Sequence, residues 1–370
     1  MKHILLIVGS QLHINELFLA YIRSQYLHHF GESALIFYVR DGDNELPFKI
    51  EKYAKHTKII TIVASDANFS TIAKILSTLS NDTLELKDTT LAPSRARLEA
   101  KDSFVVELEN AKINLLKAIP TQILPPFLLH LEDKMLSFNL LDIDKNSALS
   151  VLKELGVVHN VQIIASNILE NLVYVKAISQ KFGQLDGFLA EVKNNFVRHF
   201  IASDNIVEFI VSRLKEIKAS ITLAESCTAG LGACLLGQIP GVSEIFAGSV
   251  ISYANYIKNI WLNVDESILN EHGAVSAPCV EAMATGALNL CGADYALAIS
   301  GIAGPGGGSL EKPVGTVFIA AASKQSVYSK KINLSGDRDY IRKQSALSAY
   351  AFLLSSFWSE ICAFKDEEKI

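Results

Sequence analysis

The 370-residue sequence is short of cysteine, proline and net charge, and each shortage excludes a class of protein. Five cysteines without Cys-x-x-Cys spacing argue against a disulfide framework and predict reduced thiols in a cytoplasmic protein. Nine prolines and 49% hydrophobic residues exclude a disordered chain. With a net charge of −5, the chain lacks the excess of Lys and Arg that is typical of nucleic-acid-binding proteins. No apolar run reaches the roughly 20 residues of a membrane span, so no membrane association is expected.

The chain is too long for one ordinary core and predicts two or three domains. In residues 1–130, apolar runs at 4–8, 34–39 and 59–63 alternate with helical patterns at 14–27 and 68–80. This alternation predicts a mostly parallel sheet covered by helices, ending in a hairpin formed by 103–108 and 113–116. Prolines at 120, 125 and 126 favour a boundary near 130.

The sequence predicts two further units, at residues 131–203 and 204–370. The first is a small α+β unit. Its expected strands are 135–141, 161–165 and 172–175, and its expected helices are 147–155 and 185–200. Ser203-Asp204 can cap the next helix, so the third domain begins near 204. This domain is expected to be α/β, with ligand at the carboxyl ends of its strands. Its expected strands are 221–224, 245–253, 295–299, 314–322 and 327–334, and its expected helices are 226–236, 255–262, 276–290 and 337–357.

Glycine is concentrated in the third domain, where 15 of the 21 glycines lie between Gly230 and Gly336. Glycine permits positive φ and close approach of the backbone to a ligand. The loop 301–308 has five glycines, is stiffened by Pro305 and Pro313, and can offer N–H groups to a phosphate or an oxyanion. It lacks the Gly-Lys-Ser/Thr ending of a Walker loop. The third domain is therefore expected to hold a small-molecule site.

The candidate nucleophiles are serines that need a base. His272, just ahead of a helix, is better explained as a turn or capping residue. Lys258 can serve if burial leaves its amine neutral, although its spacing alone favours a solvated helix residue. Ser226 is expected at a helix start, where it can bind phosphate or cap the helix, and Ser243 lies in a loop that can face a cleft.

Three further residues leave alternatives open. Cys227 can be a thiol nucleophile at a helix N-terminus, but a packed small side chain is favoured for it. Arg338 and Arg342, expected on the first turns of the last helix, can clamp a phosphate or form an ordinary surface pair.

Five motifs together resemble the CinA family, specifically its C-terminal amidohydrolase domain, which deamidates nicotinamide mononucleotide. The resemblance covers about residues 205–360. The motifs are Glu-Ser-Cys-Thr-Ala-Gly at 225–230, Pro-Gly-Val-Ser at 240–243, Tyr-Ala-Asn-Tyr-Ile-Lys at 253–258, His-Gly-Ala-Val-Ser at 272–276 and Gly-Ile-Ala-Gly-Pro-Gly-Gly at 301–307.

The resemblance implies a serine–lysine amidase without metal or cofactor. Ser243 matches the nucleophile, Lys258 the lysine that activates it, and Tyr253 an assisting tyrosine. The expected substrate-binding residues are Ser226, Cys227, Thr228, Asn255, Gly301, Gly304, Gly306, Arg338 and Arg342. The resemblance also suggests a homodimer or a larger homo-oligomer.

The front of the chain resembles that of longer family members, with a molybdopterin-binding-like domain at 1–130 and a KH-like connector at 131–203. Gly9-Ser10-Gln11 and the glycine-free loop 63–68 depart from the family's phosphate-binding motifs. We therefore expect a degenerate structural or dimerising module. The connector, lacking a Gly-x-x-Gly loop, is not expected to bind nucleic acid. Two alternatives remain: ADP-ribose pyrophosphatase activity in the first domain, and a non-enzymatic accessory role in competence or DNA uptake.

Overall fold

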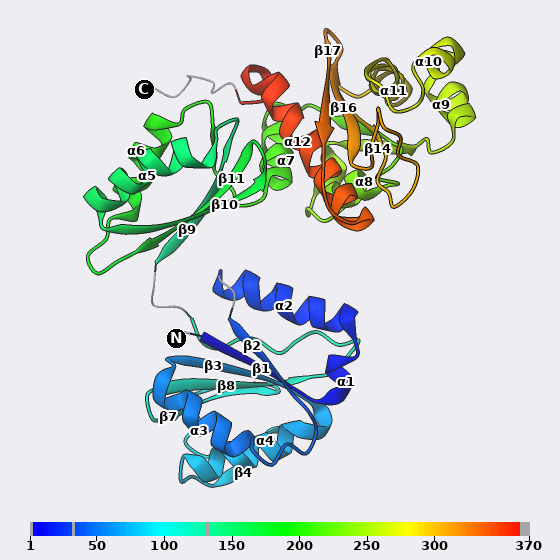
Figure 1. Cartoon of the computed structure of the whole chain (residues 1–370). Coiled ribbons are helices and arrows are strands. Elements are labelled where there is room, and N and C mark those ends of the chain that lie inside the picture. The colour runs from blue at the N-terminus through cyan, green and yellow to red at the C-terminus, as the bar shows by residue number, and fades with distance from the viewer. Residues whose placement is uncertain (1–2, 32–33, 131–133, 363–370) are drawn as a thin grey trace. The chain divides into compact units, whose positions relative to one another are not determined.

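A computed structural model describes residues 3–31, 34–130 and 134–362 (Figure 1). The chain divides into two compact units, Met1–Asp133 and Lys134–Ile370. The start of the expected connector, 131–133, lies outside the described residues.

The first unit is a six-stranded sheet in the order β2-β1-β3-β8-β7-β6. Strands β2, β1, β3 and β8 are parallel, and β7 and β6 continue the sheet antiparallel. The elements are β1 His3–Val8, α1 Ser10–His13, α2 Glu16–Phe30, β2 Leu35–Val39, α3 Leu46–His56, β3 Ile59–Ser65, α4 Asp66–Leu79, β4 Leu84–Lys87, β5 Thr90–Pro93, β6 Leu98–Ala100, β7 Ser103–Leu108 and β8 Ala111–Ala118. The predicted parallel sheet and hairpin are confirmed, and α3 was not predicted.

The second unit begins with a four-stranded antiparallel sheet in the order β10-β11-β9-β12. Its helices α5 and α6 pack together and share a hydrophobic core with the sheet. The elements are β9 Met135–Leu141, α5 Lys145–His159, β10 Val161–Leu169, β11 Leu172–Ser179, α6 Leu185–Asn195 and β12 Phe200–Ile201.

A five-stranded sheet in the order β14-β13-β15-β16-β17 follows in the same unit. Strands β14, β13 and β15 are parallel, and β16 and β17 are antiparallel to their neighbours. The elements are α7 Ile206–Glu216, β13 Ile221–Glu225, α8 Leu231–Gly237, the 3₁₀ turn η1 Val242–Glu244, β14 Phe246–Ile251, α9 Asn255–Leu262, α10 Glu266–Glu271, α11 Ala277–Cys291, β15 Tyr295–Gly301, β16 Thr316–Ser323, β17 Val327–Asn333 and α12 Arg338–Ile361.

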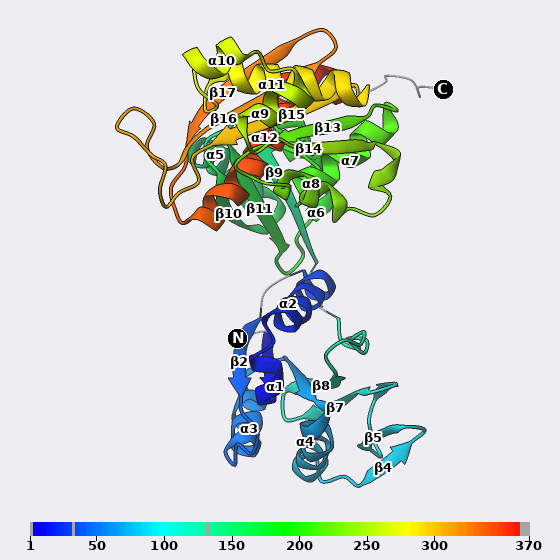
Figure 2. The ribbon, with the colours of Figure 1, turned by 90° about the vertical axis from the view of Figure 1, so that its right-hand side faces the viewer.

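Helices cover both faces of this sheet (Figure 2). One face packs against α7, α8 and α12, and the other packs against α11 with the end of α9. The core on the α12 side also contains residues of the four-stranded sheet, namely Leu141, Leu169, Leu172 and Ile201. The two sheets of the second unit therefore share one hydrophobic core.

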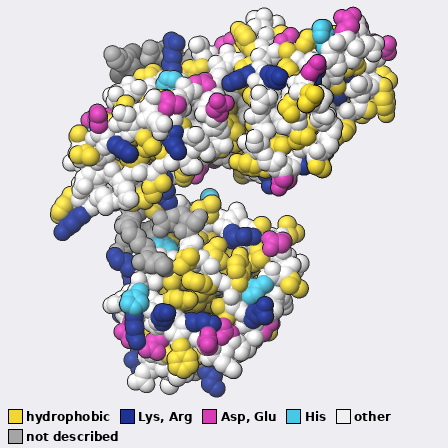
Figure 3. Space-filling model, in the orientation of Figure 1, with side chains coloured by type: hydrophobic (Ala, Val, Ile, Leu, Met, Phe, Trp, Pro, Cys, Tyr) yellow, Lys and Arg dark blue, Asp and Glu magenta, His cyan; other side chains and the backbone are white. Residues whose placement is uncertain are grey.

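Within the described residues, no helix is long and apolar enough to cross a membrane. On the face of the second unit visible in Figure 3, Lys and Arg side chains are interspersed with Asp and Glu side chains. No single-sign patch dominates this face.

Candidate functional site

The site lies at the carboxyl end of β13, where a tight turn separates the strand from α8. Ser226 is the first residue after the strand, and its backbone N–H donates to the carbonyl of Ile299 at 2.9 Å. The turn contains two positive φ angles, 50° at Ala229 and 92° at Gly230. Helix α8 begins only at Leu231, so the prediction of a helix start at Ser226 was wrong.

Glu225 holds this turn in place from inside the protein. Its fully buried carboxylate accepts hydrogen bonds from the N–H groups of Gly230, Gly232 and Ala233 at 2.9–3.0 Å and from the Ser249 hydroxyl at 3.2 Å. The negative charge also suits the positive end of a helix. Because Glu225 occupies the N-terminus of α8, that terminus is not available to a substrate phosphate. Glu225 was not predicted to have a role, although a carboxylate between a buried strand and a glycine turn indicates one.

Lys258 is fully buried and points to Ser226. It lies on α9, which follows β14, the neighbour of β13 in the sheet. Its Nζ is 3.1 Å from Ser226 Oγ, 2.6 Å from the Ser252 carbonyl oxygen and 3.1 Å from the Tyr253 carbonyl oxygen. The three oxygens match the three donors of the ammonium form. In the neutral amine, which has two N–H donors and one lone pair, the two carbonyls would match the donors and the lone pair would be left for the serine hydroxyl.

Burial lowers the pKa of the Lys258 ammonium from its ordinary value of 10.5, because the charged form loses its hydration. Among the described side chains, no salt bridge to Asp or Glu restores the charged form. The lysine therefore has the environment that a general base needs.

Cys227 is next to Ser226 but has the opposite environment for nucleophilic attack. Its side chain packs into the hydrophobic core, and burial raises the pKa of the thiol to about 12. A thiol with such a pKa remains protonated at neutral pH and is a poor nucleophile. This environment favours the predicted packing role of Cys227 over the role of a nucleophile.

Ser243 lies at the other end of the strands. Strands β13 and β14 are parallel and pair from Ile221 with Phe246 to Glu225 with Ile251, with one register shift after Ile221. Ser226 follows the end of β13, whereas Ser243 is on the exposed turn η1, before the start of β14. A six-residue strand such as β14 spans roughly 17 Å. The structure therefore brings Lys258 to Ser226 and does not bring it to Ser243.

Tyr253 contributes its backbone carbonyl to Lys258, and its side-chain hydroxyl bonds to a different residue. The side chain is 56% exposed, and its hydroxyl accepts a hydrogen bond from Arg338 Nη2 at 3.2 Å. Arg338 Nη1 also donates to the carbonyl of Gly304 at 2.7 Å. Arg338 thus ties the β14–α9 connection to the glycine loop.

Arg342 and Thr228, close to the pair formed by Ser226 and Lys258, each have a polar side-chain atom without a hydrogen-bond partner among the described residues. Arg342 Nη2 donates to the Thr228 carbonyl at 2.6 Å. The buried Arg342 Nε and Thr228 Oγ1, like Ser252 Oγ, have no hydrogen-bond partner within the described part of the chain. Buried donors of this kind are normally satisfied, so a ligand oxygen would complete them.

The other residues predicted to bind substrate lie on α9, at the end of β15 and in the glycine loop that follows it. Asn255 is exposed at the start of α9. Gly301 ends β15, and a Cβ there would meet Val317 Cγ2 at 2.7 Å, whereas Gly306 faces open space. His272 is the C-cap of α10 and is exposed, in keeping with a turn role.

The corresponding strand ends of the first unit are filled by their own side chains. Asn68 Nδ2 donates to Asp41 Oδ1 at 2.6 Å and to Ser65 Oγ at 2.7 Å, and Asp41 Oδ2 accepts from the Ser10 N–H. Gly9, with φ 125°, is needed because a Cβ would come within 2.5 Å of Ser65 Oγ. The absence of hydrolase activity in this unit stays a prediction.

Across residues 3–31, 34–130 and 134–362, no group of three or more His, Cys, Asp or Glu side chains is arranged to hold a metal ion.

The part of the chain that contains Ser226 and Lys258 matches a known protein family. The family model described as the CinA C-terminal domain matches residues 203–357. A "CinA-like protein" of Thermotoga maritima is 41% identical over 167 residues, which cover 45% of this chain and 41% of that protein. A "CinA-like protein" of Geobacter metallireducens is 43% identical over 187 residues, covering 49% of this chain and 45% of that protein. The matches therefore span less than half the length of these relatives.

Among solved structures, the competence damage-inducible protein A of Klebsiella pneumoniae is 30% identical, with a TM-score of 0.40. That match covers 42% of this chain and 98% of the other. The competence/damage inducible protein of Agrobacterium tumefaciens is 35% identical, with a TM-score of 0.39, and the match covers 40% of this chain and 94% of the other.

The family model falls on the part of the second unit that carries the serine–lysine pair. Residues 203–357 of this chain form a CinA C-terminal domain.

Proposed function

We propose that this protein is an amidase that hydrolyses the carboxamide of nicotinamide mononucleotide, with Ser226 as nucleophile and Lys258 as its base. One observation carries the proposal: the fully buried amine of Lys258 lies 3.1 Å from Ser226 Oγ. The CinA C-terminal domain, whose family the motifs resemble, supports the choice of substrate. The dyad replaces the pairing with Ser243 that the resemblance implied.

Acylation begins with proton transfer from Ser226 Oγ to the neutral amine of Lys258. The oxygen attacks the carboxamide carbon, and a C–O bond forms as the carbonyl becomes an oxyanion. The Lys258 ammonium then returns its proton to the amide nitrogen. The C–N bond breaks, ammonia leaves, and Ser226 is left as an acyl ester.

Deacylation repeats the same steps with water in place of the serine. Lys258, neutral again, accepts a proton from water, which attacks the ester carbon. The C–O bond to Ser226 breaks, and Lys258 returns the proton to Ser226 Oγ. The products are nicotinic acid mononucleotide and ammonia.

The turn that follows Ser226 can stabilise the oxyanion. The N–H groups of Cys227 and Thr228 donate to no acceptor on another of the described residues. They come directly after the nucleophile, where a backbone N–H can point at the developing charge. We assign them as the oxyanion hole.

Arg342 and Thr228 are the best candidates to bind the phosphate. Their buried donors, Nε and Oγ1, are unsatisfied within the described residues, and an anionic oxygen would accept from both. Arg338 lies one helical turn before Arg342 on α12 and reaches the glycine loop. Binding energy from the phosphate would orient the distant carboxamide on Ser226.

Ammonia release from nicotinamide mononucleotide by the purified full chain tests the proposed function. We expect turnover that continues in the presence of EDTA, because the dyad needs no metal. Nicotinamide riboside, which lacks the phosphate, should react with a higher KM. Absence of ammonia release from both compounds would refute the proposed activity.

Replacing Arg342 by methionine should raise the KM for nicotinamide mononucleotide roughly 10- to 100-fold, since a charged hydrogen bond to phosphate is lost. The KM for nicotinamide riboside should change little. Lys343→Met is the matched control, because Lys343 is the next residue on α12 and is exposed and paired with Asp339. Equal effects on both substrates would show that Arg342 acts on the fold of the site instead.

A further inference from the structure

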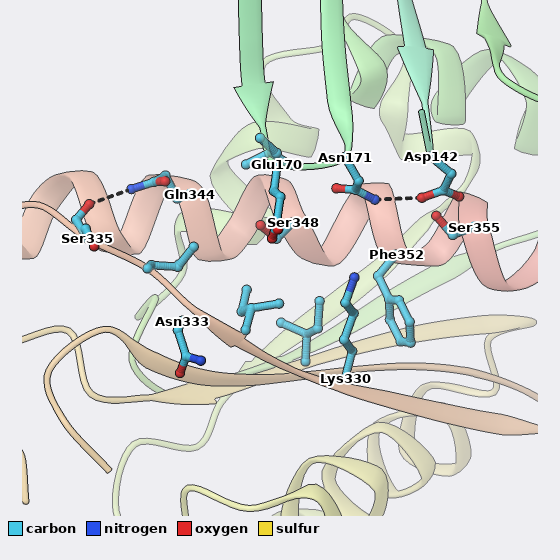
Figure 4. Close-up of a pocket in the computed structure, with 14 residues that line it drawn as sticks. Asp142, Glu170, Asn171, Lys330, Asn333, Ser335, Gln344, Ser348, Phe352 and Ser355 are labelled. Atoms are coloured by element: carbon cyan, nitrogen blue, oxygen red, sulfur yellow. Dashed lines mark hydrogen bonds between the residues drawn. The ribbon is translucent and has the colours of Figure 1, made fainter. Parts of the chain in front are cut away.

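A cavity lies elsewhere in the second unit, between the four-stranded sheet and α12. Its volume is about 380 Å³, within the range of small-molecule sites. One wall comes from the β9–α5 and β10–β11 connections, and the others come from α12 and from β16 and β17 (Figure 4). None of its lining residues belongs to the serine–lysine site.

The cavity has an apolar base. Ile319 of β16 is directly opposite Lys330 of β17 in the antiparallel register, and Ile332 and Leu334 follow Lys330 on the same face. Phe352 of α12 completes this surface. It can receive a hydrocarbon or aromatic group.

Charges of opposite sign lie on facing walls of the cavity. Asp142 and Glu170 line the wall formed by the four-stranded sheet, and Lys330 lines the wall formed by β17. Figure 4 shows the Glu170 side chain pointing toward Ser348 of α12, and the Lys330 side chain pointing from β17 toward the same helix. Among the residues that the structure describes, Lys330 makes no ion pair with either carboxylate.

The polar side chains of the cavity are partly fixed by one another. Asn171 Nδ2 donates to Asp142 Oδ1 at 2.7 Å, which leaves Asp142 Oδ2 free to accept another bond. Asp142 has a φ of 56°, which is uncommon for a residue other than glycine. Gln344 Nε2 donates to the Ser335 carbonyl at 3.1 Å, which leaves its Oε1 as a further acceptor. The walls formed by the four-stranded sheet and by α12 therefore both offer acceptors.

We propose that this cavity binds a free amino acid with an apolar side chain. Its ammonium group would lie against Glu170 and Asp142, its carboxylate against Lys330, and its side chain on Phe352 and Ile332. Such a zwitterion complements all three charges and the apolar base at once. A simple amine would leave Lys330 unmatched, and a simple acid would leave both carboxylates unmatched.

Three probes that share one side chain separate these contacts in titration calorimetry with the full chain. They are L-phenylalanine, phenethylamine, which lacks the carboxylate, and 3-phenylpropanoate, which lacks the amine. We expect L-phenylalanine to bind the parent protein most tightly. Lys330→Met should weaken its binding roughly 10-fold or more and leave phenethylamine unaffected. Glu170→Gln should weaken both L-phenylalanine and phenethylamine.

Lys331→Met is the matched control, because Lys331 is the adjacent exposed residue on β17 and lies over Phe318 instead of in the cavity. It should leave all three affinities unchanged. Both substituted residues, Lys330 and Glu170, are exposed, so their variants should fold. No binding of L-phenylalanine or L-leucine at millimolar concentration would overturn the proposal, as would binding that neither Lys330→Met nor Glu170→Gln weakens. The result does not depend on amidase activity.

Discussion

Replacing Ser226 by alanine should lower kcat for ammonia release roughly 10⁴-fold, because the acyl-enzyme cannot form without its oxygen. The Ser226 backbone contact to Ile299 does not involve the side chain, so the turn should persist. The measurement is steady-state ammonia release at saturating nicotinamide mononucleotide, with unfolding of the variant followed in parallel.

Ser243→Ala is the discriminating control for Ser226. Ser243 is exposed and precedes β14, at the far end of the strand pair from Lys258. Its replacement should change kcat less than about threefold, as expected for a surface residue outside the chemistry. If Ser243→Ala were inactive and Ser226→Ala active, the dyad proposed here would be wrong and the pairing implied by the resemblance would stand.

Replacing Lys258 by methionine should lower kcat/KM roughly 10²- to 10⁴-fold, the usual contribution of a general base. Lys258→Arg should be equally inactive, although it keeps a positive charge, because a guanidinium cannot become a neutral base in a protein. Activity in Lys258→Arg would show that the lysine acts only through its charge.

The pH dependence follows from the direction of the pKa shift. Burial lowers the pKa of Lys258, so the amine becomes neutral at a lower pH than an exposed lysine does. The kcat/KM of the parent protein should rise as pH increases through this lowered pKa, and this limb should vanish in Lys258→Met. A profile that falls with increasing pH through this region would contradict a neutral base.

The free energy of unfolding should also increase with pH because of Lys258. At a pH between the two pKa values, the unfolded chain binds a proton at Lys258 that the folded protein releases. The free energy of unfolding therefore rises with pH over that interval through this group, and the gain is lost as pH falls through the folded pKa.

Much of the fold could be predicted from the sequence because its strands are continuous apolar runs. Residues of β1 and β3 are buried along the whole strand, as expected for parallel strands covered on both faces. Short helices were harder to predict: α3 and α10 were missed, although Pro47 in the first turn of α3 and Asp265 before α10 both favour a helix start. The start of α8 was predicted too early because serine is a common N-cap residue. In the structure, the carboxylate of Glu225 accepts the hydrogen bonds from the N–H groups at the start of the helix instead.

The site could be predicted only in part. Lys258 is identifiable from its apolar neighbours, yet its spacing alone favours a solvated helix residue. Its partner depends on which strand ends meet, and that is fixed by sheet order rather than by distance along the chain. Ser226 is 32 residues from Lys258 and Ser243 only 15, but parallel pairing of β13 with β14 brings the farther one into contact.

The shared core of the second unit has a consequence for how this protein unfolds. Leu141, Leu169, Leu172 and Ile201 of the four-stranded sheet are packed in one cluster with β16 and α12. Neither sheet can lose its structure without exposing apolar surface of the other, so the two should melt in a single cooperative transition. Cutting the chain near residue 203 would leave residues 204–370 with exposed apolar surface, so this fragment should self-associate and have a lower melting temperature.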